Sequence, residues 1–150
     1  MKIDHVGIAV KSLGESKAFY EALGLLCGGE EEVTDQKVRV AFFPAGDSRI
    51  ELLEPTDPLG PIGRFLEKRG PGLHHLCVQV EDIDKALAGL RAEGYALIDQ
   101  EPKVGAGGSL VAFVHPKSTG GVLLELYQPH SESENRRAGG PEQASHAESP

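Results

Sequence analysis

Cysteine, positive charge and long apolar runs are all scarce in this 150-residue sequence. The two cysteines, Cys27 and Cys77, have neither the spacing of a metal-binding motif nor a disulfide framework around them, which favours free thiols in a reducing compartment. No secretory signal pattern opens the sequence and no apolar stretch approaches membrane length, so we expect a cytoplasmic protein. The net charge of -8 argues against nucleic acid and anionic membranes as partners, although local lysines could still bind an anionic substrate.

The length permits one compact domain with a sizeable core, and we predict this domain over residues 1–129. The segment 130–150 is different in kind. It is rich in Ser, Glu, Gly and Pro and has almost nothing to bury, so we predict a disordered tail there.

The sequence repeats itself at an offset of 70 residues. The stretch DHVGIAVKSLGESKAFYEALGL (4–25) aligns with HHLCVQVEDIDKALAGLRAEGYAL (74–97). Each alternates apolar and polar residues as a strand does, and then shows the periodicity of an amphipathic helix that ends at a glycine. Ser12 and Asp82 stand where the helix N-caps are expected.

The second part of the repeat has the pattern of a β-hairpin. VAFFPAGDSRIELLEP (40–55) resembles VAFVHPKSTGGVLLELYQP (111–129), with turn residues in the middle of each. Each unit therefore reads as strand, helix, strand, strand, strand. The two units cover about 2–54 and 73–128, and the linker 55–72 is expected to hold a short helix.

The repeat duplicates one histidine and one glutamate, His5 with Glu51 and His75 with Glu125. A carboxylate buried in an apolar strand without a partner costs on the order of several kcal/mol, so two matched glutamates beside two matched histidines predict a metal site. Small residues such as Gly7 leave room beside His5. Two imidazoles and two carboxylates suit a hard or borderline divalent ion, whereas structural zinc would more often use cysteine.

Neighbouring side chains in a strand point to opposite faces, so His74 is not expected to be a ligand beside His75 and is predicted to be structural or close to the site.

Paired βαβββ units with this His/Glu pattern resemble the vicinal oxygen chelate superfamily. FLEKRGPGLHHLCVQVEDID, and GAGG followed by HPKSTGGVLLEL, are similar to segments of the methylmalonyl-CoA epimerases, and the resemblance extends over about 2–127. It implies an α+β fold in which two tandem units form a cupped, mostly antiparallel sheet around one divalent metal ion. It also implies a homodimer, and it favours cobalt, with Mn, Ni, Zn and Mg as the other ions to consider.

The resemblance further implies an isomerase of propionate metabolism that interconverts (R)- and (S)-methylmalonyl-CoA. The C2 proton is removed while the metal, as a Lewis acid, stabilises the enolate. Inversion needs two acid–base groups. The resemblance assigns one role to Glu125, which would also be a ligand, and the other to Asp35, where the family has a glutamate. Aspartate is one methylene shorter, so Glu32 is an alternative, and a merely solvated acidic loop is another.

Three residues are predicted to bind the substrate. Lys103 and Lys117 would bind the phosphates of the CoA part, and Ser118 would hold the substrate carboxylate.

Other functions stay open on the sequence. A glyoxalase I-like lactoylglutathione lyase would use the same four ligands. A ring-cleaving iron dioxygenase would need two histidines and only one carboxylate. A non-catalytic binding module of the same fold would typically lack the four ligands.

Overall fold

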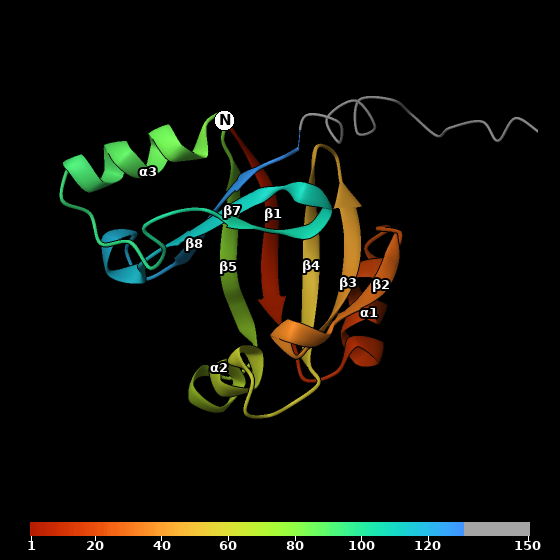
Figure 1. Ribbon diagram of the computed structural model, residues 1–150. Coiled ribbons are helices and arrows are strands. Elements are labelled where there is room, and N and C mark those ends of the chain that lie inside the picture. The colour runs from red at the N-terminus through yellow and green to blue at the C-terminus, as the bar shows by residue number, and fades with distance from the viewer. Residues whose placement is uncertain (131–150) are drawn as a thin grey trace, which may run out of the picture.

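The computed structural model describes residues 1–130, so all of the predicted tail except its first residue lies outside the described residues. The strand–helix–strand–strand–strand order occurs twice, as the repeat predicts, and the α+β class is confirmed (Figure 1). The helix α2 connects the two units. In chain order the elements are β1 (Lys2–Ala9), α1 (Leu13–Ala22), β2 (Gly29–Val33), η1 (Thr34–Gln36), β3 (Val38–Ala45), β4 (Ser48–Pro55), α2 (Pro61–Arg69), β5 (Gly72–Gln79), α3 (Ile83–Ala92), β6 (Lys103–Val104), η2 (Ala106–Gly108), β7 (Leu110–Val114), η3 (Pro116–Ser118) and β8 (Leu123–Gln128).

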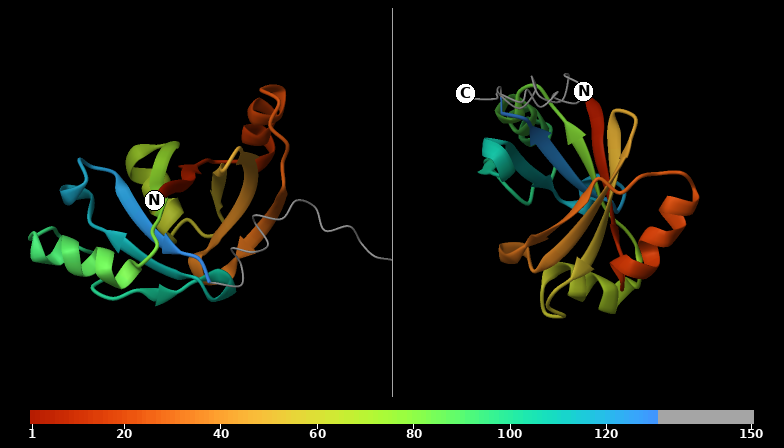
Figure 2. Two further views of the ribbon diagram at one scale, coloured as in Figure 1. Left: turned by 90° about the horizontal axis from the view of Figure 1, so that it is seen from above. Right: turned by 90° about the vertical axis from the view of Figure 1, so that its right-hand side faces the viewer.

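All eight strands form one sheet in the order β2-β3-β4-β1-β5-β8-β7-β6. The antiparallel pair β1–β5 lies at its centre and joins the two units. Each of these strands also pairs in parallel with the last strand of its own unit, β1 with β4 and β5 with β8. The sheet is strongly curved, and its two halves face one another across a concave side (Figure 2).

Helices cover both sides of this curved sheet. On the outer side, α1 packs Leu13 against Phe43 and Leu52, and α3 packs Ile83 against Val114 and Leu126 of the second unit. On the concave side, α2 packs Ile62 against Ala9 and Leu53. Leu52 and Leu126 face the outer side. Because side chains alternate along a strand, the odd-numbered residues directly before and after each of them face the concave side.

The N-caps predicted from the sequence are confirmed. Ser12 Oγ accepts a hydrogen bond from the Glu15 backbone N–H at 3.4 Å, and Asp82 Oδ1 accepts one from the Lys85 backbone N–H at 2.9 Å. None of the helices within residues 1–130 is long and apolar enough to cross a bilayer.

The central β1–β5 pair contains two irregularities, one before each predicted ligand histidine. Ile3 pairs with Val78 but His5 with Cys77, which leaves Asp4 as an extra residue on β1. In the same way, His74 is an extra residue on β5. Since residues 4 and 74 are equivalent in the repeat, the same β-bulge occurs once in each unit, and a bulge locally breaks the alternation of side chains.

Candidate metal centre

Four side chains that the repeat singles out converge on the concave side of the sheet, one from each of the adjacent strands β4, β1, β5 and β8. The Nε2 atoms of His5 and His75 are 3.0 Å apart. Glu51 Oε2 and Glu125 Oε2 each lie 3.5 Å from His5 Nε2, and Glu125 Oε2 lies 3.5 Å from His75 Nε2 as well. We call these four residues the His–Glu cluster. Ligand atoms of His5, His75 and Glu125 thus lie within 4.8 Å of one another, and Glu51 joins this group through its contact with His5.

The His–Glu cluster is mostly shielded from solvent. The side chains of His5, Glu51 and His75 are each 10 % exposed or less, and that of Glu125 is 14 % exposed. Glu125 is thus the member of the cluster most accessible to a substrate.

The pKa values of the two imidazoles shift in opposite directions. Burial acts to lower the pKa of His5, but hydrogen bonds, first of all to Asp4, and nearby carboxylates outweigh it and raise the pKa to about 11. Burial and the positive charges of His5 and His74 lower the pKa of His75 to about 3. Two carboxylates and two imidazole nitrogens that face one another are electron-rich and need a cation between them. This donor set fits a divalent metal ion, whose binding requires both imidazoles to be unprotonated at the ligand nitrogen.

A second group of potential ligands lies directly behind the cluster. Asp4, His5 and Cys77 also offer ligand atoms within 4.8 Å of one another. Burial, however, raises the pKa of the Cys77 thiol to about 11, and a protonated thiol is a poor ligand. The His–Glu cluster is the better metal site of the two.

A buried charge network supports the first half of the cluster. Asp4 Oδ2 accepts a hydrogen bond from His5 Nδ1 at 2.8 Å, and Arg49 Nη1 lies 3.1 Å from the same oxygen. Arg49 Nε donates to Glu51 Oε1 at 2.8 Å. The sequence reasoning missed both residues. Arg49 could have been found, since it lies two residues before Glu51 on the same strand face, but alternation alone places Asp4 on the other face.

Space for the second histidine depends on Gly7. Gly7 lies opposite His75 in the β1–β5 register, and an added Cβ would meet the imidazole Cε1 at 2.2 Å. The expectation that small residues leave room at this position is confirmed.

His74 approaches the site despite the expected alternation of faces. Its Nδ1 lies 2.9 Å from Nδ1 of His75. The β-bulge at His74 is the reason, because the extra residue interrupts the alternation that the sequence argument assumes.

The two candidates for the second acid–base residue lie in the segment of the first unit that holds β2 and η1. Asp35 is exposed in η1, between β2 and β3, and is not among the residues whose ligand atoms lie within 4.8 Å of one another at the cluster. Glu32 is exposed on β2, with Oε2 3.7 Å from Arg39 Nη2. The structure does not bring either carboxylate to the His–Glu cluster.

The predicted substrate-binding residues have different surroundings. Lys103 Nζ pairs with Asp99 Oδ1 at 2.6 Å on the edge strand β6. Ser118 Oγ accepts a hydrogen bond from the Ala96 backbone N–H at 2.8 Å. Lys117 is exposed and has no ion pair with a carboxylate in the described part of the chain.

A small cavity is lined by His74 and by no member of the His–Glu cluster itself. It measures about 190 Å³ and lies between α2 and the 116–123 segment. His74, whose ring contacts His75, is one of its walls. Lys68 and Arg69 also line it, and neither has a carboxylate partner within residues 1–130. Lys68 and Arg69 thus bring positive charge to this cavity, where Arg69 also lies over the Phe65 ring, 5.7 Å from its centroid.

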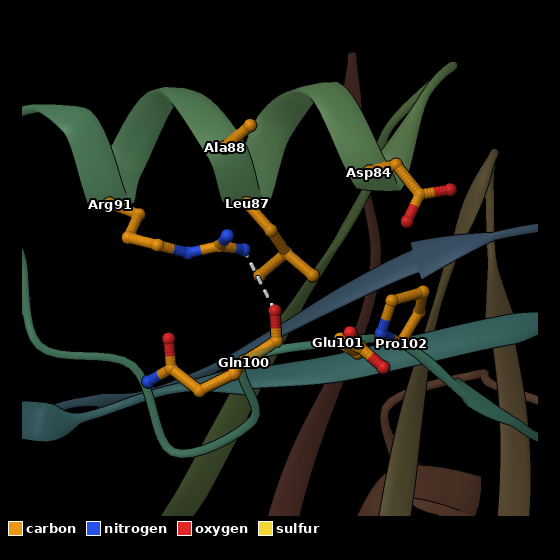
Figure 3. Close-up of a pocket in the computed structure, with 7 residues that line it drawn as sticks. All are labelled: Asp84, Leu87, Ala88, Arg91, Gln100, Glu101 and Pro102. Atoms are coloured by element: carbon orange, nitrogen blue, oxygen red, sulfur yellow. Dashed lines mark hydrogen bonds between the residues drawn. The ribbon is translucent and has the colours of Figure 1, made fainter.

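A larger cavity, about 440 Å³, lies between α3 and residues 100–102 (Figure 3). Arg91 projects into it and donates to the Gln100 carbonyl at 2.8 Å. No member of the His–Glu cluster lines this cavity, so it is not part of the candidate metal centre.

Comparisons with known proteins identify the family of the chain. Residues 4–113 match the Glyoxalase/Bleomycin resistance protein/Dioxygenase superfamily. The chain is 41 % identical to the ethylmalonyl-CoA/methylmalonyl-CoA epimerase of Cereibacter sphaeroides, covering 85 % of this chain and 97 % of that protein.

Two solved structures extend the comparison. Methylmalonyl-CoA epimerase from Mycobacterium tuberculosis is similar with a TM-score of 0.78 and 36 % identity, over 89 % of this chain and 91 % of that one. The Streptomyces coelicolor methylmalonyl-CoA epimerase in complex with 2-nitronate-propionyl-CoA is similar with a TM-score of 0.77 and 36 % identity, over 87 % and 96 %. The chain therefore belongs to the Glyoxalase/Bleomycin resistance protein/Dioxygenase superfamily and, within it, to the methylmalonyl-CoA epimerase family.

Proposed function

We propose that this protein interconverts (R)- and (S)-methylmalonyl-CoA with one divalent metal ion held by His5, Glu51, His75 and Glu125. The observation that carries the proposal is the convergence of two imidazoles and two carboxylates at one site. The proposed substrate is taken from the similar proteins, which are methylmalonyl-CoA epimerases. Cobalt is our first choice of ion, as the family resemblance suggests, followed by Mn, Ni, Zn or Mg.

The bound ion would act as a Lewis acid toward the thioester and carboxylate oxygens of the substrate. The protein side chains do the rest. His5, Glu51 and His75 are the more buried groups and serve only as ligands. Glu125 is more exposed and carries a second role, because its carboxylate takes the proton when the C2–H bond breaks. The electron pair of that bond stays on the substrate, and a second acid returns a proton to the opposite face of C2.

The two units surround the cluster unequally, and this favours one side for the substrate. Arg49 fills the space beside Glu51. Its counterpart in the second unit, two residues before Glu125, is Leu123, which lines the 190 Å³ cavity instead. We propose that the acyl group reaches the cluster through this cavity. Lys68 and Arg69 would then face the phosphates of the CoA part.

Lys117 stays in the proposal as a further phosphate-binding residue, since it is exposed next to Pro116 of the cavity wall. Lys103 and Ser118 keep their predicted roles only if they exchange the partners that they have in the structure, Asp99 and the Ala96 backbone. A homodimer also stays a prediction.

Proton exchange at C2 tests the function directly. In deuterated water the protein should exchange the C2 proton of methylmalonyl-CoA and interconvert the two epimers, as followed by NMR. A strong chelator should stop both reactions, and one equivalent of Co²⁺ should restore them. Full activity after complete removal of metal would contradict the metal-dependent mechanism. Turnover of the hemithioacetal of methylglyoxal and glutathione, with none of methylmalonyl-CoA, would favour the lactoylglutathione lyase alternative.

Asp35→Asn tests the second acid–base role. If Asp35 returns the proton, the variant should lose about 10²–10⁴-fold in epimerisation in both directions. Its Co²⁺ affinity should stay near that of the wild type, because Asp35 is not among the residues whose ligand atoms meet at the cluster. It should still exchange the C2 proton of one epimer, since Glu125 can remove and return a proton on the same face.

Glu32→Gln is the matched control for this variant, because Glu32 lies in the same acidic segment and is paired with Arg39. A change of less than about threefold for Asp35→Asn would be typical of a surface substitution and would remove Asp35 from the mechanism. A loss confined to Glu32→Gln would assign the role to Glu32.

A further inference from the structure

The two ring nitrogens of each histidine in the His–Glu cluster point to different partners. In both rings Nε2 points into the cluster, where the two Nε2 atoms are 3.0 Å apart. In both rings Nδ1 points to the residue immediately before it in the chain. Asp4 Oδ2 lies 2.8 Å from His5 Nδ1, and His74 Nδ1 lies 2.9 Å from His75 Nδ1.

The β-bulges create these contacts. In a regular strand the residue before an inward-facing histidine would point to the outer side of the sheet. The extra residues Asp4 and His74 interrupt this alternation at equivalent places in the two units. The same backbone irregularity therefore places a partner beside Nδ1 of each ligand histidine. The partner is a carboxylate in the first unit and an imidazole in the second.

The Asp4 contact fixes the tautomer of His5. A carboxylate oxygen can only accept, so Nδ1 of His5 must carry a hydrogen, and Nε2 is the nitrogen whose lone pair would bind a metal once its own proton has left. Arg49 Nη2 lies 3.3 Å from the same Nδ1. A nitrogen that donates to Asp4 has no lone pair for this guanidinium, so we regard the approach as a contact only. Arg49 instead holds Asp4 in place through Nη1 at 3.1 Å.

The His74 contact can fix His75 in the same way. Two imidazole nitrogens 2.9 Å apart require one donor and one acceptor. If His75 donates from Nδ1, its Nε2 lone pair faces the cluster as that of His5 does, and His74 is the acceptor. Phe65 of α2 holds the His74 ring edge-on, with the ring centroids 5.0 Å apart.

We propose that Asp4 and His74 are equivalent positioning residues, which the two β-bulges place so that each ligand histidine presents the lone pair of Nε2 to the metal. The proposal rests on the proposed metal site. Partners of this kind set the orientation and basicity of a ligand histidine, and their loss typically weakens metal binding by about 10–100-fold.

Co²⁺ binding to the whole chain tests the proposal without any turnover. Its Kd is measured by competition with a chromophoric chelator, and the d–d absorption of bound Co²⁺ reports the ligand geometry. His74→Phe keeps a ring against Phe65 but removes the acceptor, and we expect it to weaken Co²⁺ binding by about 10–100-fold and to change the d–d spectrum. His74→Gln retains an acceptor, and we expect it to stay within about threefold of the wild type.

The first unit is tested by the same comparison. Asp4→Leu should weaken Co²⁺ binding by about 10–100-fold, and Asp4→Asn, whose amide oxygen can still accept, should weaken it less. Asp99→Asn is the matched control. Asp99 is also a buried aspartate, but it accepts from the Phe113 backbone N–H and pairs with Lys103, away from the cluster. It should leave Co²⁺ affinity unchanged.

The outcomes separate this inference from the proposed function. Wild-type binding of Co²⁺ with no loss in His74→Phe and Asp4→Leu would overturn the positioning role alone. Equal losses in His74→Phe and His74→Gln would overturn it too, since the acceptor would then not matter. If Asp4→Leu does not fold, as thermal unfolding of the metal-free variants will reveal, the two His74 variants decide the question. A wild-type protein that does not bind Co²⁺ would contradict both proposals.

Discussion

Glu125→Gln is expected to abolish epimerisation and to weaken metal binding at the same time. In the proposed mechanism this carboxylate is both a ligand and the group that takes the C2 proton. A glutamine amide can neither neutralise the ion nor accept the proton. Loss of a general base alone typically costs about 10²–10⁴-fold in rate, and the weakened metal site adds to that. Epimerisation should be measured from both epimers, together with the Kd for Co²⁺.

Glu51→Gln is the matched control, because Glu51 occupies the equivalent strand position but is proposed to be a ligand only. It should also weaken Co²⁺ binding, yet at saturating Co²⁺ it should recover far more turnover than Glu125→Gln does. Equal recovery of the two variants at saturating metal would show that Glu125 is not the base. It would restrict Glu125 to the role of a ligand.

Gly7→Ala is expected to disrupt the metal centre through a single methyl group. The added Cβ would lie 2.2 Å from Cε1, 2.4 Å from Nδ1 and 2.8 Å from Nε2 of His75. None of these distances is sterically possible, so the imidazole must move from its position in the cluster. We expect a loss of at least about tenfold in Co²⁺ affinity and a comparable loss of turnover.

Gly89→Ala provides the control for this substitution. Gly89 lies in α3, is exposed, and a Cβ there would meet nothing within 4 Å. This change should leave metal binding and turnover untouched and should stabilise the helix by about 1 kcal/mol. Wild-type Co²⁺ affinity in Gly7→Ala would mean that the strands can separate enough to accept the methyl group. Gly7 would then not be required for the site.

The parts of the fold that depend on periodicity could be predicted from the sequence. Alternation gives the strands. The 70-residue repeat places His5 and His75 at equivalent positions and the hairpin match pairs Glu51 with Glu125, so the four proposed ligands can be predicted without knowledge of the sheet order. The caps at Ser12 and Asp82 follow from local hydrogen bonding. These features depend on residues close in sequence or on a pattern that occurs twice.

Features that depend on a break in the pattern could not be predicted in this way. A β-bulge has no clear sequence signature of its own. Alternation alone places Asp4 and His74 on the face opposite the neighbouring histidines, whereas the bulges bring both to the site. Lys103 is a second case. Its charge predicts a phosphate contact, but its pairing with Asp99 depends on how the segment after α3 packs, which no local pattern specifies.

The central β1–β5 pairing has the symmetry of a contact between two copies of one protein. Val6 lies opposite Leu76, and the pair His5–Cys77 is related to Gly7–His75 by exchanging the two units. An interface in which residue i meets j while j meets i is isologous. A half-length ancestor with one βαβββ unit could therefore build the whole ligand set by self-association, each copy supplying one histidine and one glutamate. Joining two copies in one chain then lets each half diverge, as Arg49 beside one glutamate and an open cavity beside the other illustrate.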